Sequence, residues 1–207
     1  WASAASVERI ESELLRGWLH LPALPNGKAL ALFHGAGSNC DSKLLIAVAE
    51  AFAAAGWAVY RGDLPYRQLR PTGPPLRDQA RDRAGIRAAI DFLATRFSQV
   101  YVGGHSYGGR QASMLAAEDP SGIQGLLLLS YPLHPPRKSA ELRTAHFPTL
   151  RVPALFVHGT RDPFGSPDEM SAGLALIPGK TQLALQPGLG HELHPRITPA
   201  LPALRAA

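Results

Sequence analysis

The sequence contains one cysteine, Cys40, so it cannot form a disulfide within the chain. It has no apolar run close to the roughly 20 residues that a membrane-spanning helix needs. Charged residues are few, at 18% against 45% hydrophobic residues, and this balance excludes a disordered protein. These absences favour a folded protein of a reducing compartment, and we predict a cytoplasmic location. Because the chain begins at Trp1 rather than Met, removal of a preceding signal peptide stays open.

The length of 207 residues is enough for one sizeable hydrophobic core and too short for two domains of ordinary size. No internal repeat, low-complexity tract or linker divides the sequence. We therefore predict a single domain over residues 1–207. Nothing in the composition indicates an oligomeric state.

Basic residues outnumber acidic ones, 21 against 16, and the formal net charge is +5. One stretch, interrupted by Asp78 and Asp82, is rich in arginine: Arg61, Arg67, Arg70, Arg77, Arg81, Arg83 and Arg87. A solvated helix face with i,i+4 ion pairs explains most of them. Arg67 and Arg70 are also candidates for a basic rim that attracts an anionic substrate. The bases are not interleaved with aromatic residues and no nucleic-acid-binding motif is present, so we predict no nucleic-acid partner.

Short apolar segments alternate with helical patterns, which predicts an α/β protein with a mostly parallel central sheet and helices on both faces. The predicted strands cover residues 7–10, 14–21, 29–33, 57–60, 100–102, 125–129, 152–157 and 181–186, the first two as an antiparallel pair. Helices are predicted from a cap at Asp41 or Ser42 to Gly56, over 76–97, from a glycine-rich turn at 103–109 to about residue 118, and from Ser166 to Pro178. A proline-rich loop at 64–75 and a short helix at 139–145 complete the prediction.

The pentapeptide at residues 104–108 reads Gly-His-Ser-Tyr-Gly and matches the G-x-S-x-G pattern. It follows an apolar strand and opens a helix, which is the setting of a nucleophile elbow. Such a turn projects a strained serine into the crevice beyond the strand ends, where open α/β sheets bind ligands. A tight structural turn before a helix is the alternative. We predict that Ser106 is a nucleophile.

A serine nucleophile requires a base, and the base requires an acid that holds it in one tautomer. In this setting the acid and then the histidine follow the serine along the chain. Asp162 and His191 each follow a predicted strand, so both loops leave the sheet at the same edge as Ser106. We predict Asp162 as the acid and His191 as the base. Asp168, in the first turn of a helix, and His194, three residues later, are the rivals.

Acyl transfer also needs hydrogen-bond donors for a tetrahedral oxyanion. We predict the backbone N–H of Tyr107, the residue after the nucleophile, as one donor. The second is expected from the glycine-rich loop at 34–38, where the Ala36 amide is our choice and Gly37 the alternative. Cys40 lies just beyond this loop but lacks an elbow, so we interpret it as inert.

Several segments resemble a compact branch of the α/β-hydrolase superfamily: Phe33–Gly37, Asp63–Tyr66, Gly108–Arg110, Tyr131–Pro136 and His158–Gly165. This branch is often described as dienelactone-hydrolase-like, and it includes relatives of mammalian testis-expressed and nonspecific-lethal-complex proteins. The resemblance covers nearly the whole chain and implies an α/β-hydrolase fold. Members often carry Lys and Met beside the nucleophile, where this chain has His105 and Tyr107. Dienelactone hydrolases use Cys where this chain has Ser106.

The segment at 131–151 is too short to hold a large cap domain, so we predict an open site. The loop at 61–75 and the segment at 131–136 are its expected walls, with Tyr131 as a candidate substrate contact. We predict a hydrolase of small-molecule carboxylic esters or thioesters that acts through an acyl-enzyme, without cofactor or metal. A non-catalytic scaffold for protein binding and an acyltransferase or perhydrolase with the same triad are the alternatives.

Overall fold

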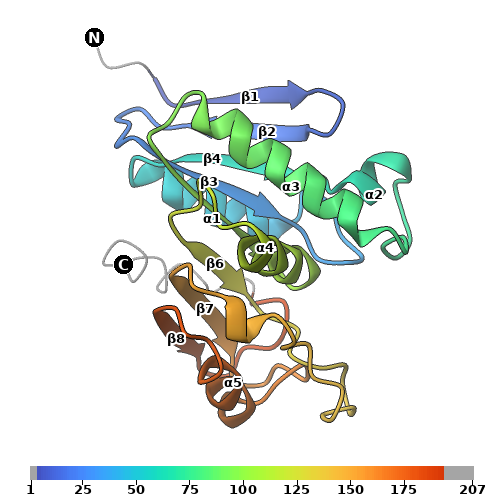
Figure 1. Ribbon diagram of the computed structural model, residues 1–207. Helices are drawn as coiled ribbons and strands as arrows, with labels where there is room; N and C mark the ends of the chain where they lie inside the picture. The colour runs from blue at the N-terminus through green and yellow to red at the C-terminus, as the bar shows by residue number, and fades with distance from the viewer. Residues whose placement is uncertain (1–3, 194–207) are drawn as a thin grey trace.

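The computed structural model describes residues 4–193, which form an eight-stranded sheet flanked by helices (Figure 1). The strands are β1 (Ser6–Glu11), β2 (Arg16–Leu21), β3 (Lys28–Phe33), β4 (Ala58–Gly62), β5 (Gln99–His105), β6 (Leu126–Leu129), β7 (Ala154–Gly159) and β8 (Thr181–Gln186). Their order across the sheet is β1-β2-β4-β3-β5-β6-β7-β8. β2 is antiparallel to both β1 and β4, and β3 to β8 run parallel. The predicted sheet with an opening antiparallel pair is confirmed.

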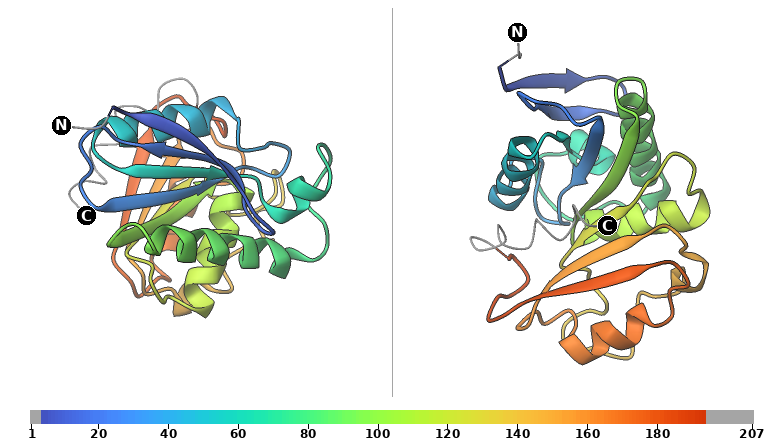
Figure 2. Two further views of the ribbon diagram at one scale, coloured as in Figure 1. Left: turned by 90° about the horizontal axis from the view of Figure 1, so that it is seen from above. Right: turned by 90° about the vertical axis from the view of Figure 1, so that its left-hand side faces the viewer.

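Helices cover both faces of this sheet, as predicted. They are α1 (Lys43–Ala54), α2 (Pro65–Leu69), α3 (Gln79–Ala94), α4 (Tyr107–Glu118) and α5 (Pro167–Leu174), with a 3-10 turn, η1, at Phe147–Thr149. The right-hand view of Figure 2 shows α1 on one side of the sheet and α3, α4 and α5 on the other. Two hydrophobic cores result, one under α1 and one under the remaining helices. No large cap domain lies among the described residues.

Local sequence explains where these elements lie. β6 is leucine at all four positions and fully buried, as expected for a strand covered on both faces. α1 begins after Ser42, whose hydroxyl accepts the Leu45 N–H. α5 begins with a capping box in which Ser166 and Glu169 accept each other's backbone N–H. The predicted start of α5 is thereby confirmed.

The prediction of a loop over residues 64–75 is wrong in its first half, where Pro65–Leu69 form α2. Pro65 occupies the first position of this helix, where its fixed φ is favourable and its missing N–H costs nothing. α3 is shorter than the predicted helix over 76–97, because the Asp78 side chain caps it by accepting the Arg81 N–H.

The short helix predicted at 139–145 is absent from the described structure. The backbone there bonds outward instead. The Arg143 N–H donates to the Leu133 carbonyl at 2.8 Å, and the Tyr131 hydroxyl donates to the Arg143 carbonyl at 2.7 Å. The N–H and the carbonyl of Arg143 therefore already have hydrogen-bond partners outside the segment and do not need the partners that a helix would supply.

The strand order reverses at β3, which lies between β4 and β5. The chain leaves β3 through α1 on one face and enters β5 after α3 on the other. The loops after β3 and β5 therefore diverge and leave a crevice at the carboxyl edge of the sheet. Because β7 and β8 are parallel to β5 and β6, their loops end at the same edge. Every helix within residues 4–193 falls short of the length and apolarity needed to cross a bilayer.

Candidate active site

Ser106 stands alone between β5 and α4, so the turn is much tighter than the predicted 103–109. Its φ of 51° and ψ of −116° put a non-glycine residue in a strained conformation. Close packing requires the neighbouring glycines. A Cβ on Gly104 would lie 2.2 Å from the Phe33 carbonyl oxygen, and one on Gly108 would lie 2.6 Å from the His34 oxygen. The strand and helix that hold Ser106 are thus pressed against the end of β3.

Three side chains at this edge form one hydrogen-bonded chain. Ser106 Oγ lies 2.9 Å from His191 Nε2, and His191 Nδ1 lies 2.8 Å from Asp162 Oδ2. Since a carboxylate only accepts hydrogen bonds, a neutral His191 carries its proton on Nδ1 and accepts the Ser106 hydroxyl at Nε2. The structure therefore brings together the three residues that the sequence singled out. Of the rivals, Asp168 lies in the first turn of α5, and His194 lies outside the described residues.

Several contacts hold His191 in this position. Its ring stacks on Phe164, with ring centroids 4.2 Å apart. Its carbonyl accepts hydrogen bonds from His105 Nε2 at 2.9 Å and from the Ser130 hydroxyl at 2.6 Å. Burial lowers the pKa of His105, which favours the neutral ring. The second oxygen of Asp162 accepts the Phe164 N–H at 2.8 Å, so the acid is fixed as well.

Ala36 and Tyr107 line the pocket in front of this chain, as does the alternative donor Gly37. Among the described residues, the N–H groups of Ala36 and Tyr107 have no hydrogen-bond partner. Tyr107 is the first residue of α4, where amides point out of the helix end. The Ala36 carbonyl accepts the Tyr66 hydroxyl at 2.6 Å and Arg67 Nη2 at 3.1 Å, which fixes the loop after β3. Two such amides beside a serine suit a developing oxyanion.

The three residues proposed from sequence as substrate contacts do not line this pocket. Arg67 is 2% exposed, and its guanidinium donates to the carbonyls of Ala36, Ser38, Arg70 and Gly73. Arg70 donates to the Pro74 carbonyl. Tyr131 is 1% exposed and donates its hydroxyl to the Arg143 carbonyl. Because the protein itself takes up these polar groups, the three residues build the walls rather than face a substrate.

The pocket in front of Ser106 has a volume of about 640 Å³. Its lining includes polar residues that sequence reasoning missed: Gln79, Arg110, Arg143 and Glu192. Arg110 had a readable signal, because it follows Ser106 by four residues and so shares its side of α4. Arg143 had none, since it lies in an irregular segment whose course depends on tertiary hydrogen bonds.

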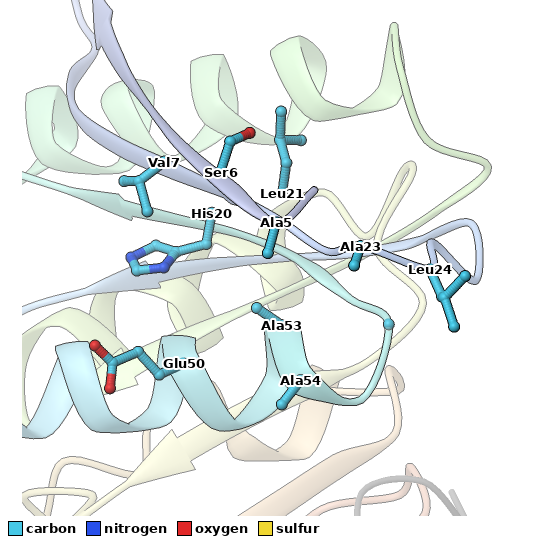
Figure 3. A pocket seen from close by; sticks show the side chains of 11 residues that line it. Ala5, Ser6, Val7, His20, Leu21, Ala23, Leu24, Glu50, Ala53 and Ala54 are labelled. Carbon is cyan, nitrogen blue, oxygen red and sulfur yellow. The ribbon is translucent and has the colours of Figure 1, made fainter. Parts of the chain in front are cut away.

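A second hollow, of about 380 Å³, lies between the β1–β2 hairpin and α1 (Figure 3). Alanine, valine and leucine side chains make up most of its lining, with His20 and Glu50 among them. His20 Nε2 accepts the Arg61 Nε–H at 2.8 Å, and burial, together with the Arg61 charge, lowers the His20 pKa to about 4. The hollow shares no residue with the pocket of Ser106 and has no hydrogen-bonded serine and histidine among its described residues.

Cys40 is buried, and this burial raises the pKa of its thiol to about 12. A protonated thiol is a poor nucleophile, which fits the interpretation of Cys40 as inert. Among residues 4–193, no group of three or more His, Cys, Asp or Glu side chains is arranged to hold a metal ion.

Residues 26–201 match a protein family whose model is described as "Alpha/beta hydrolase domain". A curated protein from Nocardia uniformis subsp. tsuyamanensis, named "Putative esterase NocK", is 35% identical over 167 residues. The matched region covers 76% of this chain and 46% of that protein, so the chain spans about half the length of this relative.

Solved structures with a similar fold can be superposed on nearly the whole of this chain. A dienelactone hydrolase from Anabaena variabilis ATCC 29413 has a TM-score of 0.74 at 24% identity, over 98% of this chain and 95% of its own. Est1E from Butyrivibrio proteoclasticus, solved with ferulic acid, has a TM-score of 0.76 at 19% identity, over 93% of this chain and 94% of its own. At these identities the likeness shows a shared fold.

Proposed function

The chain belongs to the α/β-hydrolase family, and we propose that it is a serine hydrolase that cleaves carboxylic esters through an acyl-enzyme intermediate. The observation that carries this proposal is the hydrogen-bonded chain of Ser106, His191 and Asp162 at the crevice of the sheet. A serine hydroxyl needs a base within about 2.6–3.2 Å, and the base needs an acid behind it. Both distances in this chain meet that requirement.

In the proposed first step, Ser106 Oγ attacks the ester carbonyl carbon while His191 Nε2 takes the hydroxyl proton. The negative charge that develops on the carbonyl oxygen is stabilised by the N–H groups of Ala36 and Tyr107. The buried carboxylate of Asp162 stabilises the imidazolium that forms. When the tetrahedral intermediate collapses, the bond to the alkoxide breaks and His191 protonates the departing alcohol.

The second step repeats this chemistry with water. His191 Nε2 takes a proton from water, whose oxygen attacks the acyl carbon bound to Ser106. The same amides hold the second oxyanion, and its collapse returns the proton to Ser106 Oγ and releases the carboxylic acid. No metal or cofactor takes part in this proposal.

The names of the relatives agree with ester chemistry. NocK carries the name of an esterase, and the two solved structures are a dienelactone hydrolase and a protein with bound ferulic acid. These names describe those proteins. They support a carboxylic ester as the substrate class for this chain, because the same fold brings Ser106, His191 and Asp162 within hydrogen-bond distance here.

The proposal is tested with 4-nitrophenyl esters whose acyl chains increase in length from acetyl. We expect turnover of at least one ester by the wild type, and a loss of about 10³-fold or more in Ser106→Ala, because no other group can form the acyl-enzyme. Ser171→Ala, on the exposed surface of α5, is the matched control and is expected to keep the wild-type rate. Circular dichroism checks that each variant folds. Wild-type turnover by a folded Ser106→Ala would contradict the proposal.

A further inference from the structure

Two arginines in the pocket of Ser106 have no carboxylate partner. Arg110, in the first turn of α4, and Arg143, in the segment between β6 and β7, both line the pocket. Within residues 4–193 neither forms a salt bridge. The Nε of Arg110 is buried and has no hydrogen-bond partner there. Burying a charged donor without a partner is unfavourable, so these groups require an explanation.

Other arginines of the chain show how the protein normally treats this side chain. Several lie 3.2 to 3.6 Å from an Asp or Glu oxygen: Arg16, Arg61, Arg83, Arg87 and Arg96. The buried Arg67 has no such ion pair but donates to backbone carbonyls. Among residues 4–193, the remaining arginines without an ion pair either donate to a backbone carbonyl, as Arg70 does, or are exposed: Arg9, Arg77, Arg81, Arg137, Arg151 and Arg161. Arg110 and Arg143 differ because they are partly buried and line the pocket, where Arg143 has one long hydrogen bond, of 3.4 Å, to the Pro132 carbonyl.

Arg110 and Arg143 act on the same small region. Burial and the nearby Arg110 charge lower the pKa of Arg143. Burial lowers the pKa of His146 to about 4, and Arg110 adds to this shift, so His146 stays neutral at neutral pH. Two cations on one wall of a partly enclosed pocket create a field that attracts an anion.

Hydrogen bonds fix the backbone of both arginines. The Arg110 N–H donates to the Ser106 carbonyl at 2.9 Å, which puts Arg110 one helical turn, about 6 Å, further along α4. The backbone of Arg143 is tied to Leu133 and Tyr131 at 2.8 Å and 2.7 Å. Since both arginines also line the pocket of Ser106, an anionic group held by both would lie in the same pocket as the carbonyl that Ser106 attacks.

Among the described lining residues, Glu192 supplies the only carboxylate. It is exposed, and its charge partly opposes the burial that lowers the pKa of His105, on the His191 side of the pocket. The carboxylate that acts on Arg143 is Glu141, whose charge opposes the burial that lowers the Arg143 pKa but which does not line the pocket. The pocket thus has a cationic wall on the Arg110 side and an exposed carboxylate on the His191 side.

We propose that Arg110 and Arg143 bind an anionic group of the substrate, so that the preferred esters carry a carboxylate or a phosphate close to the scissile carbonyl. This rests on the proposed function of Ser106. A planar guanidinium can bind either group through two parallel hydrogen bonds. The cationic site expected from sequence at Arg67 and Arg70 is in this account formed by a different pair.

The test compares two fluorogenic 4-methylumbelliferyl esters of equal chain length, the anionic glutarate half-ester and the neutral pentanoate. We expect wild-type kcat/KM to favour the anionic ester, and Arg110→Gln and Arg143→Gln each to reduce that preference about 10- to 100-fold, as loss of a charge-assisted hydrogen bond should. Circular dichroism checks that each variant folds. Arg137→Gln, an exposed arginine of the same segment that does not line the pocket, is the matched control.

A second measurement uses the wild type alone. The preference should fall as NaCl rises from about 0.05 M to about 0.5 M, because salt screens the attraction. Competitive inhibition of pentanoate hydrolysis by glutarate and by inorganic phosphate then distinguishes the two anions. Equal kcat/KM for both esters, or a preference that persists in salt and in both Gln variants, would overturn this inference and leave the hydrolase proposal intact. If neither of these esters nor any of the 4-nitrophenyl esters is hydrolysed, both proposals are overturned.

Discussion

On one side of Ser106 the groups proposed to act are the side chains of Asp162 and His191, and on the other side they are the backbone amides of Ala36 and Tyr107. Asp162 and His191, here called the acid–base side, lie in the loops after β7 and β8, whereas Ala36 and Tyr107, the oxyanion side, come directly after β3 and β5. The two sides are supported differently. The Phe164 ring stacks on His191 within the pocket, whereas Tyr66 and Arg67 of α2 donate hydrogen bonds to the Ala36 carbonyl.

This difference shows which changes should matter most. A side chain that moves a proton cannot be replaced by its neighbours, so removing it should cost most of the rate. A backbone N–H is kept in every substitution except one to proline, and its position shifts gradually when the side chains that support it are removed. We therefore expect large effects on the acid–base side and moderate, graded effects on the oxyanion side.

The largest of these effects is expected for Asp162→Asn. It should reduce kcat by about 10³–10⁴-fold, because His191 would no longer be held in the tautomer that accepts the Ser106 proton. Asp168→Asn, in the first turn of α5, is the control and should change the rate little. Steady-state hydrolysis of a 4-nitrophenyl ester measures both. If the two variants exchanged effects, Asp168 would be the acid and the acid–base side would be misassigned.

A moderate effect is expected on the oxyanion side, for Tyr66→Phe. The variant loses the hydroxyl that donates to the Ala36 carbonyl at 2.6 Å but keeps the ring that packs on Tyr107. We expect kcat to fall about 10-fold with KM nearly unchanged, because the oxyanion exists only in the transition state. Tyr101→Phe, on the far side of the sheet against Trp57, is the matched control. A rise in KM at constant kcat would show that Tyr66 acts on substrate binding instead.

The smallest effect concerns pH and His34, at the end of β3. Its Nδ1 donates to the Gly35 carbonyl at 2.8 Å and its Nε2 accepts the Leu64 N–H at 3.0 Å, so the neutral ring is required. Burial lowers its pKa to about 4, whereas an unfolded histidine titrates near 6.5. As pH falls from 6.5 to 4, the unfolded chain binds a proton that the folded chain does not, and stability decreases.

His34→Gln removes this titration, so its Tm should fall less than that of the wild type between pH 7 and pH 4.5, by roughly 5 to 10 °C. Differential scanning fluorimetry across this range measures the difference. His20 and His146 titrate in both proteins and contribute equally to both slopes. Parallel slopes for the two proteins would mean that His34 does not couple the oxyanion side to pH.

The arrangement of Ser106, Asp162 and His191 could be predicted from sequence because each of these residues follows a strand, and parallel strands end at the same edge of the sheet. The glycine-rich loop at 34–38 indicated where Ala36 would lie, but the sequence did not show that Tyr66 and Arg67 hold its carbonyl. Arg67 illustrates why. A sequence shows the charge of an arginine but not the carbonyls that surround it in the fold. Arg67 was predicted to contact substrate, but in the structure it donates to the carbonyls of Ser38 and Ala36 and so supports their loop.

The pocket wall shows the same limit. Arg110 follows Ser106 at helical spacing and could have been placed from sequence. Arg143 lies where a helix was predicted, and the tertiary hydrogen bonds to Tyr131 and Leu133 that set its position leave no local pattern. Strand positions were predictable throughout, because β6 and its neighbours read as short apolar runs between helices.

Covalent labelling with a fluorophosphonate, mapped by mass spectrometry of the digested protein, tests whether Ser106 is the nucleophile. The reagent reacts with a serine that an adjacent base activates. We expect one adduct, on Ser106, which is absent in folded Ser106→Ala and forms much more slowly in Asp162→Asn. An adduct on another residue, or labelling that persists in folded Ser106→Ala, would contradict this expectation.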